Sequence, residues 1–492
     1  MRASGILMHI TSLPDAYGIG TMGSQAYEFV DFLQKTGQRY WQILPLTPTG
    51  YGDSPYQSCS TFAGNPYLID LQQLIEVGLL REEEVSGISW CEQPQRVDYC
   101  LLYQNRLAVL RLAYGRFQGS AEYEAFCQKN DSWLPDFALY MALKEKFQGL
   151  PWYQWERSLK FREPQALHQA KAELQSEIDF FSFVQFLFYE QWDALRSYAH
   201  EKGVAIIGDV PIYVPYDSVE VWKEPACFQL DENGVPTAIA GVPPDGFTKD
   251  GQLWGNPLYR WDAMQKDGYQ WWLERLSAAG NCYDVVRFDH FRGLEAYWSV
   301  PYGDTTARNG RWVKGPGLDF VQTLQEKLPH IRFIAEDLGF LTPEVLELRD
   351  KSGFPGMKVL EFAFDSREPS PYLPHTYPKN SVCYTGTHDN MTMGQWLETA
   401  SNEAVAYAKS YMCLNENEGL VWGAIRTAMA SVSDLCIIPM QDYLNLGAEA
   451  RMNCPGTMSG DNWTWRAEED YLQENLAQRI FDMTKLYGRL GV

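Results

Sequence analysis

Eight short apolar runs are spread along the chain, and a helical pattern separates most of them from the next. Strand-like runs that alternate with helical patterns indicate βα units with parallel pairing, and eight parallel strands close a (β/α)8 TIM barrel. The runs are GILMHI (5–10), YWQILPL (40–46), VAIIGDV (204–210), DVVRFD (284–289), RFIAED (332–337), MKVLEFAF (357–364), SVCYTG (381–386) and LCIIPM (435–440). We therefore expect an α/β fold in which residues 1–492 form a single barrel.

Two long stretches do not fit the simple alternation of strand and helix, and we expect them to be insertions. Residues 70–198, after the second run, contain several helical patterns and predict an inserted, mainly helical subdomain. Residues 211–260, after the third run, are rich in Gly, Pro and Asn, which argues against a long helix. Because barrel loops carry function, we expect this second stretch to be an ordered loop region that covers a substrate.

The composition excludes several classes of partner. Lys and Arg number 41 against 63 Asp and Glu, which gives a net charge of −22. Such an acidic surface repels phosphate backbones and anionic lipid, so we expect no nucleic acid and no membrane partner. No stretch reaches the roughly 18 to 20 apolar residues that span a bilayer, and the start of the chain lacks a long apolar segment. We expect a soluble, cytoplasmic protein.

The ten cysteines are scattered and form no CxxC pair. Three of them, Cys282, Cys383 and Cys436, lie in apolar, strand-like runs. This pattern favours buried free thiols over a disulfide framework or a zinc site. We expect no metal centre.

Three carboxylates, Asp289, Glu336 and Asp389, each stand at the downstream end of an apolar run. In a parallel barrel the carboxyl ends of the strands share one rim, and the active site lies at that rim. These acids are therefore expected to meet in one pocket. Paired carboxylates at such a rim are what the chemistry of glycosidic bonds requires.

In the fourth run, Arg287 and Asp289 are two residues apart and should point to the same face of the strand. A guanidinium group beside a carboxylate keeps the acid ionised, as a nucleophile requires. The alternative is a structural ion pair inside the barrel. The next residue, His290, could donate a hydrogen bond to a sugar hydroxyl or be an ordinary core histidine.

Glu336 follows Phe333, Ile334 and Ala335, so its surroundings are partly apolar. Burial raises the pKa of a carboxyl group, and a Glu that stays protonated near neutral pH can act as a general acid. The alternative is an acid that caps the next helix, but Thr342 is the better helix start.

His388 and Asp389 form a pair that also occurs in serine hydrolases and metal sites. Neither a GxSxG nucleophile motif nor an HExxH zinc motif accompanies them. A clamp on sugar hydroxyls explains Asp389 better. Asp209, at the end of the third run, could contact substrate or cap a turn.

Two loops present aromatic side chains among turn residues. One loop contains Tyr51, Tyr56, Phe62 and Tyr67, and GQLWGNP presents Trp254 close to two glycines. Flat rings with a polar edge suit the faces of sugars, and glycine neighbours suit display of a Trp better than core packing. We expect Trp254 to be a stacking platform, with a core position as the alternative.

Taken together, these segments resemble the 4-α-glucanotransferases, the amylomaltase or disproportionating-enzyme family (glycoside hydrolase family 77). The resemblance covers nearly the whole chain in order, and it is carried by the segments SGILMHITSLPDAYGIGTMG, LPLTPTGYGDSPYQSCSTFAGNPYL, IIGDVPIYV, GVPPDGFTKDGQLWGNPLY, VVRFDHFRGLEAYW, IAEDLG, GFPGMKVLEFAF, YTGTHDN, QDYLNLGAEARMNCPGT and NWTWR. Two positions depart from the family pattern, Gly246 in GVPPDGF and Thr47. The departure at Gly246 bears on which acceptor sugars are preferred and not on the reaction itself.

The resemblance implies roles for individual residues. Asp289 matches the nucleophile, Glu336 the general acid/base and Asp389 the transition-state stabiliser. The residues that match positions around the transferred glucose are Tyr56, Asp209, Arg287 and His388, and those that match acceptor-side contacts are Trp254, Asn256 and Asp337.

The implied function is transfer of a segment of an α-1,4-glucan to the 4-hydroxyl of another glucan or of glucose by a retaining mechanism without a cofactor. The implied partners are α-1,4-glucans and maltooligosaccharides. The alternatives are an α-glucan hydrolase of the α-amylase type and a non-catalytic glucan-binding protein. A silent homologue would be expected to lose at least one of Asp289, Glu336 and Asp389, and all three are present.

Overall fold

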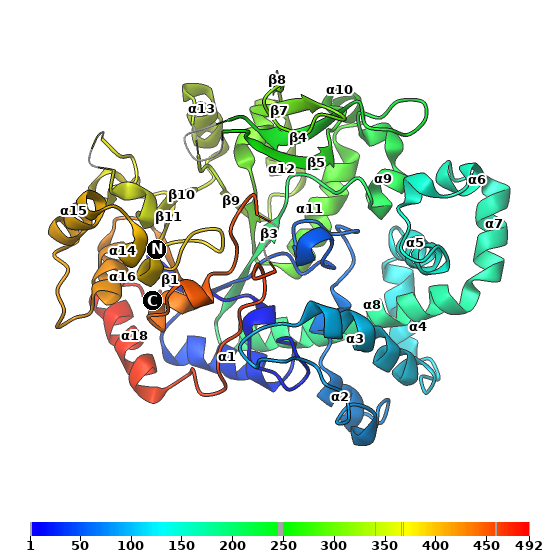
Figure 1. The fold of residues 1–492 in the computed structure, drawn as a ribbon, viewed down its shortest axis with the longest axis horizontal. Coiled ribbons are helices and arrows are strands. Elements are labelled where there is room, and N and C mark those ends of the chain that lie inside the picture. The colour runs from blue at the N-terminus through cyan, green and yellow to red at the C-terminus, as the bar shows by residue number, and fades with distance from the viewer. Residues whose placement is uncertain are drawn as a thin grey trace.

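A closed barrel of eight parallel strands forms the centre of the molecule (Figure 1). The computed structural model describes residues 2–244, 249–339, 341–365, 367, 369–457 and 460–491. Around the barrel the strands follow the order β1-β12-β11-β10-β9-β6-β3-β2. The strands are β1 (Ala3–Leu7), β2 (Tyr40–Gln42), β3 (Ala205–Val210), β6 (Val285–Phe288), β9 (Arg332–Ala335), β10 (Gly356–Val359), β11 (Ser381–Tyr384) and β12 (Leu435–Pro439). The predicted TIM barrel is confirmed, and each predicted run supplies one strand.

The barrel strands are shorter than the apolar runs that predict them. The sixth run was expected to be a strand over 357–364, but β10 ends at Val359 and a 3₁₀ helix, η8, follows at Leu360–Ala363. Strands β6, β10 and β11 are buried along their whole length. Side chains on both faces of a parallel barrel are covered, so such strands appear in the sequence as unbroken apolar runs, and a run alone does not mark where the strand ends.

Helices cover the outside of the barrel and connect its strands. In α1 the buried residues Ala26, Phe29, Val30 and Leu33 recur with helical spacing, so one side of the helix faces the barrel. The other helices of this layer and of the barrel rim are α10 (Trp261–Lys266), α11 (Gln270–Cys282), α12 (Gly317–Lys327), α13 (Pro343–Ser352), α14 (Met393–Thr399), α15 (Asn402–Met412), α16 (Leu420–Ala430), α17 (Met440–Tyr443) and α18 (Glu474–Leu486), and α1 itself is Ser24–Lys35. Thr342 is the N-cap residue of α13, as predicted.

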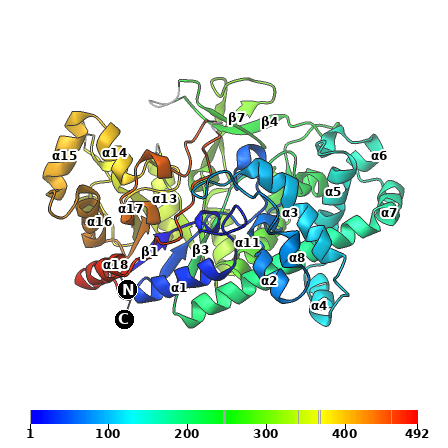
Figure 2. The same ribbon diagram turned by 60° about the horizontal axis from the view of Figure 1, so that its bottom comes forward.

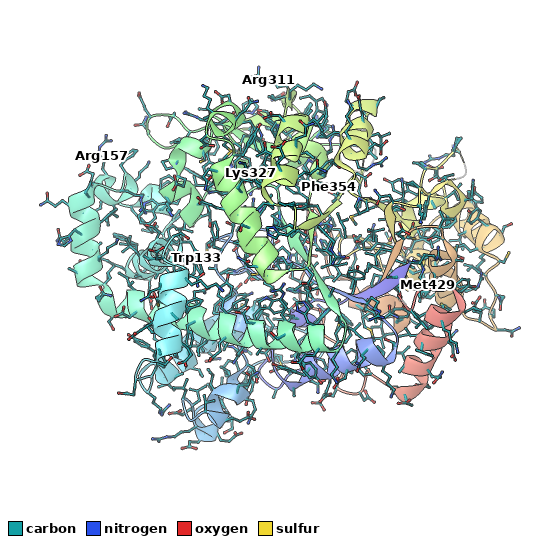
Figure 3. All side chains as sticks on the ribbon, turned by 180° about the vertical axis from the view of Figure 1, so that it is seen from behind. Trp133, Arg157, Arg311, Lys327, Phe354 and Met429 are labelled. Carbon is teal, nitrogen blue, oxygen red and sulfur yellow. The ribbon has the colours of Figure 1, made fainter. Side chains whose placement is uncertain are left out.

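Seven helices lie between β2 and β3, on one side of the barrel. They are α2 (Leu71–Glu76), α3 (Tyr99–Tyr114), α4 (Ala121–Lys129), α5 (Leu134–Lys146), α6 (Arg157–Lys160), α7 (Pro164–Glu173) and α8 (Gln175–Glu201). In the view from behind, Trp133 and Arg157 mark this side, and Met429 marks the C-terminal helices on the opposite side (Figure 3). The long helix α8 packs against α5 and also against α1 and β3. It therefore ties these helices to the barrel, and we propose that residues 70–198 form a subdomain anchored through α8.

A second sheet lies over one side of the barrel, at the top of Figure 1. Its four strands pair antiparallel in the order β5-β4-β7-β8. They are β4 (Ala238–Val242), β5 (Gln252–Pro257), β7 (Ala296–Pro301) and β8 (Arg311–Lys314), and a short helix, α9 (Val219–Lys223), precedes them. The stretch 211–260, which we expected to be an ordered loop, thus contributes two strands, and one of them, β4, also pairs with β7 from beyond β6.

The two ends of the chain meet at the seam between β1 and β12, and both views show N and C side by side (Figures 1 and 2). The buried Arg489 guanidinium donates hydrogen bonds to the carbonyl oxygens of Ala3 (2.9 Å), Met429 (2.8 Å) and Ser431 (3.1 Å). Buried carbonyl groups need such partners, so this arginine holds the C-terminal segment against the first strand.

All ten cysteines are free, and Cys383 and Cys436 are buried on neighbouring strands. The expected burial holds for these two cysteines, whereas Cys282 is partly buried and Cys100 and Cys413 are exposed. In the part of the chain that the structure describes, no helix is both long enough and apolar enough to cross a membrane.

Gly5 in β1 lies close to the backbone of the neighbouring strand β2. A Cβ atom at this position would be 2.4 Å from the Tyr40 carbonyl oxygen of β2 and 2.7 Å from Cδ1 of Ile437 on β12. We predict that Gly5→Ala lowers the free energy of unfolding by about 1 to 3 kcal/mol, because the Tyr40 carbonyl group belongs to the backbone of β2, which cannot move away without opening the barrel. Denaturant unfolding measures this loss.

Gly87→Ala is the matched control, because a Cβ atom there would have no neighbour within 4 Å. Its free energy of unfolding should change by no more than about 0.5 kcal/mol. Equal stabilities for the two variants would contradict the close packing of β1.

Candidate active site

Asp289 and Glu336 occupy equivalent places on two neighbouring strands. Each is the first residue after its strand, β6 for Asp289 and β9 for Glu336. The backbone amide of Glu336 donates to the Phe288 carbonyl oxygen (3.1 Å), and that of Asp289 donates to the Val210 carbonyl oxygen (3.1 Å). The strand pairing therefore continues through both acids, and it fixes their backbones side by side at the carboxyl end of the barrel.

Arg287 joins two of the predicted acids. Its Nη1 atom donates to Oδ2 of Asp209 (2.6 Å) and to Oδ1 of Asp289 (2.9 Å). The side chains of Arg287 and Asp209 are 4% and 0% exposed, whereas that of Asp289 is 27% exposed. Burial alone would lower the pKa of Arg287, but the two carboxylates raise it well above its usual range. A permanent positive charge thus lies beside Asp289, whose carboxylate remains open to the pocket.

Asp209 has a second partner in Tyr56, whose hydroxyl donates to the same Oδ2 atom (2.8 Å). Burial raises the pKa of Asp209 from 3.8 to about 7, and the Arg287 charge opposes that shift. The backbone register pairs Asp209 with Arg287 across β3 and β6. Asp209 does not cap a turn, because its carboxylate faces Arg287 and Tyr56, and its contact with substrate stays a prediction.

Glu336 is held by two backbone amides. Its Oε2 atom accepts from the His290 amide (2.7 Å) and its Oε1 atom from the Leu338 amide (3.0 Å). Burial raises its pKa from 4.5 to about 8, the Arg287 charge opposes the shift and the Asp289 charge adds to it. This is the direction that the apolar flank of Glu336 predicted. A carboxyl group with this pKa is mostly protonated at neutral pH and is able to donate a proton.

His290 connects the two acids through its backbone. It has a left-handed conformation (φ 52°), which is uncommon for a residue with a side chain, and this turn directs its amide to Glu336. Burial lowers the pKa of its imidazole to about 3, so the ring is neutral at ordinary pH. The Trp254 ring meets the imidazole edge-on, with 4.8 Å between ring centroids.

The third acid, Asp389, lies in the loop after β11 beside His388, with 3.4 Å between Nε2 of His388 and Oδ1 of Asp389. The Tyr56 ring stacks on the His388 ring, with centroids 5.2 Å apart and an interplanar angle of 15°. Trp463 packs against both rings at centroid distances of 5.8 and 5.9 Å. Burial lowers the pKa of His388, which favours the neutral ring as a hydrogen-bonding group.

Two residues that the sequence reasoning did not select hold Asp389 in place. The Asn453 side-chain amide donates to Oδ1 of Asp389 (2.6 Å), and Arg451 Nη2 donates to its backbone carbonyl oxygen (3.0 Å). The Asn453 backbone amide donates to the His388 carbonyl oxygen (3.0 Å). Nothing in the periodicity of the chain marks Arg451 or Asn453, because they reach Asp389 only after the barrel closes. Trp463 was missed for the same reason.

The structure does not bring every predicted residue into this cluster. Trp254 is half-buried in β5 and contacts His290 and Tyr213 at the edge of the site. Asn256 is buried in the same strand, and its side chain makes no hydrogen bond to the described residues of the cluster.

Asp337 lies outside the cluster. Its side chain is 1% exposed, and its carboxylate accepts from Arg349 Nη1 (2.6 Å) and from the Met357 amide (2.7 Å). It points away from Glu336, as alternation along an extended strand requires. The contacts of Asp337 are therefore those of a buried structural ion pair. The family resemblance suggested an acceptor-side contact, and these contacts do not support that role.

Gly246, which departs from the family pattern, lies outside the described residues. Among the residues that are described, no group of three or more His, Cys, Asp or Glu side chains is arranged to hold a metal ion.

Comparison with known proteins identifies close relatives along the full length of the chain. The family model described as 4-alpha-glucanotransferase, of glycoside hydrolase family 77, matches residues 8–472. The 4-alpha-glucanotransferase of Clostridium butyricum is 47% identical over 98% of this chain and 100% of its own length. That of Thermus thermophilus is 48% identical over 99% of both chains. The amylomaltase from Streptococcus agalactiae in complex with acarbose superposes with a TM-score of 0.97 at 43% identity, over 99% of this chain and 100% of its own.

The raised pKa of Glu336 predicts a dependence of stability on pH. Between about pH 4.5 and pH 8 the folded protein keeps a proton on Glu336 that the unfolded chain has released, so stability falls as the pH rises. The free energy of unfolding of the wild type relative to Glu336→Gln should therefore decrease across this range and level off on either side. Asp209 is present in both proteins, so its titration largely cancels in the difference.

Denaturant unfolding at a series of pH values measures this difference. Glu326→Gln, at an exposed position on α12, is the control for exchange of a carboxyl group by an amide. A wild-type stability that runs parallel to that of Glu336→Gln from pH 4.5 to pH 8 would show that Glu336 titrates normally.

Proposed function

The chain belongs to the 4-alpha-glucanotransferase family, glycoside hydrolase family 77, and from this premise we propose that it transfers a segment of an α-1,4-glucan to the 4-hydroxyl of another glucan or of glucose. The observation that carries the proposal is the pair of acids at the ends of β6 and β9. Asp289 lies against the Arg287 cation, whereas burial raises the pKa of Glu336 to about 8. One acid is thereby poised as a nucleophile and the other as a proton donor, which is the division of roles that retaining glycosidic chemistry needs.

In the first step, Glu336 donates its proton to the glycosidic oxygen while Asp289 attacks the anomeric carbon. The bond from that carbon to the leaving oxygen breaks, and the leaving part of the glucan departs with a new hydroxyl group. A covalent ester between Asp289 and the retained glucan remains, and Glu336 is now a carboxylate. The Arg287 guanidinium donates a hydrogen bond to Oδ1 of Asp289 and so orients the carboxylate beside the reacting carbon.

In the second step, the Glu336 carboxylate takes the proton from the 4-hydroxyl of an acceptor sugar, whose oxygen attacks the anomeric carbon and displaces Asp289. The pocket returns to its starting protonation state, and the configuration at the anomeric carbon is retained. Water can follow the same path and give hydrolysis. Transfer therefore depends on how well an acceptor sugar is held relative to water.

The remaining polar groups of the cluster surround the place of the reacting sugar. We assign Asp389 to clamp sugar hydroxyls in the transition state, with His388 and Tyr56 as a stacked, neutral wall beside it. Asp209 and Arg287 lie behind these two rings. Asp209 accepts hydrogen bonds from the Tyr56 hydroxyl and from Arg287, and so fixes the direction of the hydroxyl. None of these steps needs an organic cofactor.

We propose α-1,4-glucans and maltooligosaccharides as the substrates and the cytoplasm as the location. Ten free thiols, two of them buried on adjacent barrel strands, fit a reducing compartment.

Incubation with maltotriose tests the proposed reaction. We expect glucose together with maltooligosaccharides longer than maltotriose, because one molecule serves as donor and another as acceptor. Chromatography or mass spectrometry of the products measures both. Accumulation of glucose and maltose alone, with no product longer than the donor, would instead identify a hydrolase.

The same assay with Asp289→Asn tests the nucleophile. An amide does not form the covalent ester, so transfer should fall by about three orders of magnitude or more. Asp131→Asn, at an exposed position in the helical insertion, is the control for loss of one negative charge and should retain activity. A folded Asp289→Asn protein with near wild-type transfer would refute the assignment of Asp289.

Trp254 is proposed to hold the acceptor sugar, since it is partly exposed and contacts the ring of His290 beside Asp289. Loss of a stacking contact worth roughly 1 kcal/mol should weaken acceptor use in Trp254→Ala about fivefold and raise the share of hydrolysis, with little change in the melting temperature. Product ratios and thermal unfolding together check this prediction.

Trp312→Ala is the matched control, because Trp312 lies at the opposite edge of the same sheet and is 43% exposed. Its transfer-to-hydrolysis ratio should equal that of the wild type. If Trp254→Ala keeps a wild-type ratio but loses about 3 to 5 kcal/mol of stability, Trp254 is a packing residue and the platform role is excluded.

A further inference from the structure

The loop that carries His388 and Asp389 is attached at both of its ends to one buried carboxylate, Asp442. The Thr385 hydroxyl, at the start of the loop, donates to Oδ2 of Asp442 (2.5 Å). The Met393 amide, at the end of the loop, donates to Oδ1 of Asp442 (2.7 Å). Thr385 directly follows β11, and Asp442 lies in the short helix α17 that follows β12, so the contact joins the segments after two neighbouring strands.

Asp442 lies where an ionised carboxylate is shielded from the stabilising effect of solvent. Asp442 is 1% exposed, and among the described residues no Lys, Arg or His side chain lies within ion-pairing distance of it. Burial raises its pKa to about 6, and the hydrogen bonds from Thr385 and Met393 oppose that shift. A buried carboxylate without a cation depends on its hydrogen bonds, and both bonds of Asp442 go to the loop.

The loop itself is cross-linked between these two attachment points. Oδ1 of Asn390 accepts from the Thr387 amide (2.9 Å) and from the Thr387 hydroxyl (2.8 Å). The Thr385 carbonyl oxygen accepts from the Glu361 amide (3.1 Å), which fixes the first residue of the loop from a second side. A loop with few free torsions transmits a shift of either end directly to the residues between, here His388 and Asp389.

We infer that Asp442 and Thr385 are positioning residues for the sugar-binding pair His388 and Asp389. The inference rests on the proposed role of Asp389 as a clamp in the transition state. The hydrogen bonds to Asp442 hold the two ends of the loop in position, and Asn453 fixes the direction of the Asp389 carboxylate. A displacement on the order of 1 Å at a catalytic group lowers the rate strongly even when substrate still binds.

Thr385→Val and Thr385→Ser form a matched pair that tests the inference. Valine has the shape of threonine but no hydroxyl, so it removes the donor to Asp442, whereas serine keeps it. We expect kcat to fall about tenfold or more in Thr385→Val with KM changed by less than about threefold, because the clamp acts chiefly in the transition state. Thr385→Ser should keep kcat within about twofold of the wild type.

Release of 4-nitrophenol from a 4-nitrophenyl α-maltooligoside follows the rate, because it reports cleavage of the donor whether a sugar or water accepts the glucan. Thermal unfolding and the concentration of folded enzyme are measured in parallel. Equal kcat values for the two variants would overturn the inference, as would a Thr385→Val deficit that disappears when rates are expressed per folded molecule. Failure of the wild type to make longer products from maltotriose would count against glucan transfer. The comparison of Thr385→Val with Thr385→Ser would still test the inference, because it measures cleavage of the donor.

If Thr385→Val does not fold, a second pair replaces it. Asp442→Asn can still accept from the Met393 amide and can donate to the Thr385 oxygen, whereas Asp442→Ala loses both contacts. We expect Asp442→Asn to keep kcat within about threefold and Asp442→Ala to lose about tenfold or more. Equal rates in these two variants would overturn the inference.

Discussion

The buried guanidinium group of Arg287 is the interaction on which the site depends. It bonds to a fully buried carboxylate, Asp209, and to a partly open one, Asp289, from the centre of the barrel rim. Two carboxylates this close would repel each other without the cation, and burial alone would favour protonation of both. The arginine thus offsets the repulsion between these two carboxylates inside an enclosed, partly apolar pocket. The charges of Arg287 and Asp289 also act on Glu336, but burial has the larger effect on its pKa and raises it to about 8, so Glu336 is mostly protonated at neutral pH.

The barrel makes this arrangement possible because it brings six distant segments to one rim. Tyr56 comes from the loop after β2, Asp209 from β3, Asp289 and Glu336 from the ends of β6 and β9, His388 and Asp389 from the loop after β11, and Arg451 and Asn453 from beyond β12. Each acid is fixed by backbone hydrogen bonds or by a neighbouring side chain. Preorganisation of this kind lets fixed charges act on the transition state without reorganisation of solvent.

The parts outside the barrel complete the pocket and do not supply its acids. The antiparallel sheet places Trp254 against His290, and the helical insertion is joined to the barrel through α8. Under the roles proposed above, the acceptor side is therefore built from added elements, whereas the covalent chemistry belongs to the strand ends.

Local periodicity and the geometry of a parallel barrel were enough to predict the eight strands, their shared rim and the pairing of Arg287 with Asp289. The apolar residues before Glu336 also predicted the direction of its pKa shift. The second sheet, in which β4 pairs with both β5 and β7, could be seen only in the folded chain, as could the contacts of Asn453, Trp463 and Asp442. The tertiary structure also turned Asp337 toward Arg349 and away from the site. These features join residues far apart in the chain, and no local pattern encodes a contact that exists only after the barrel has closed.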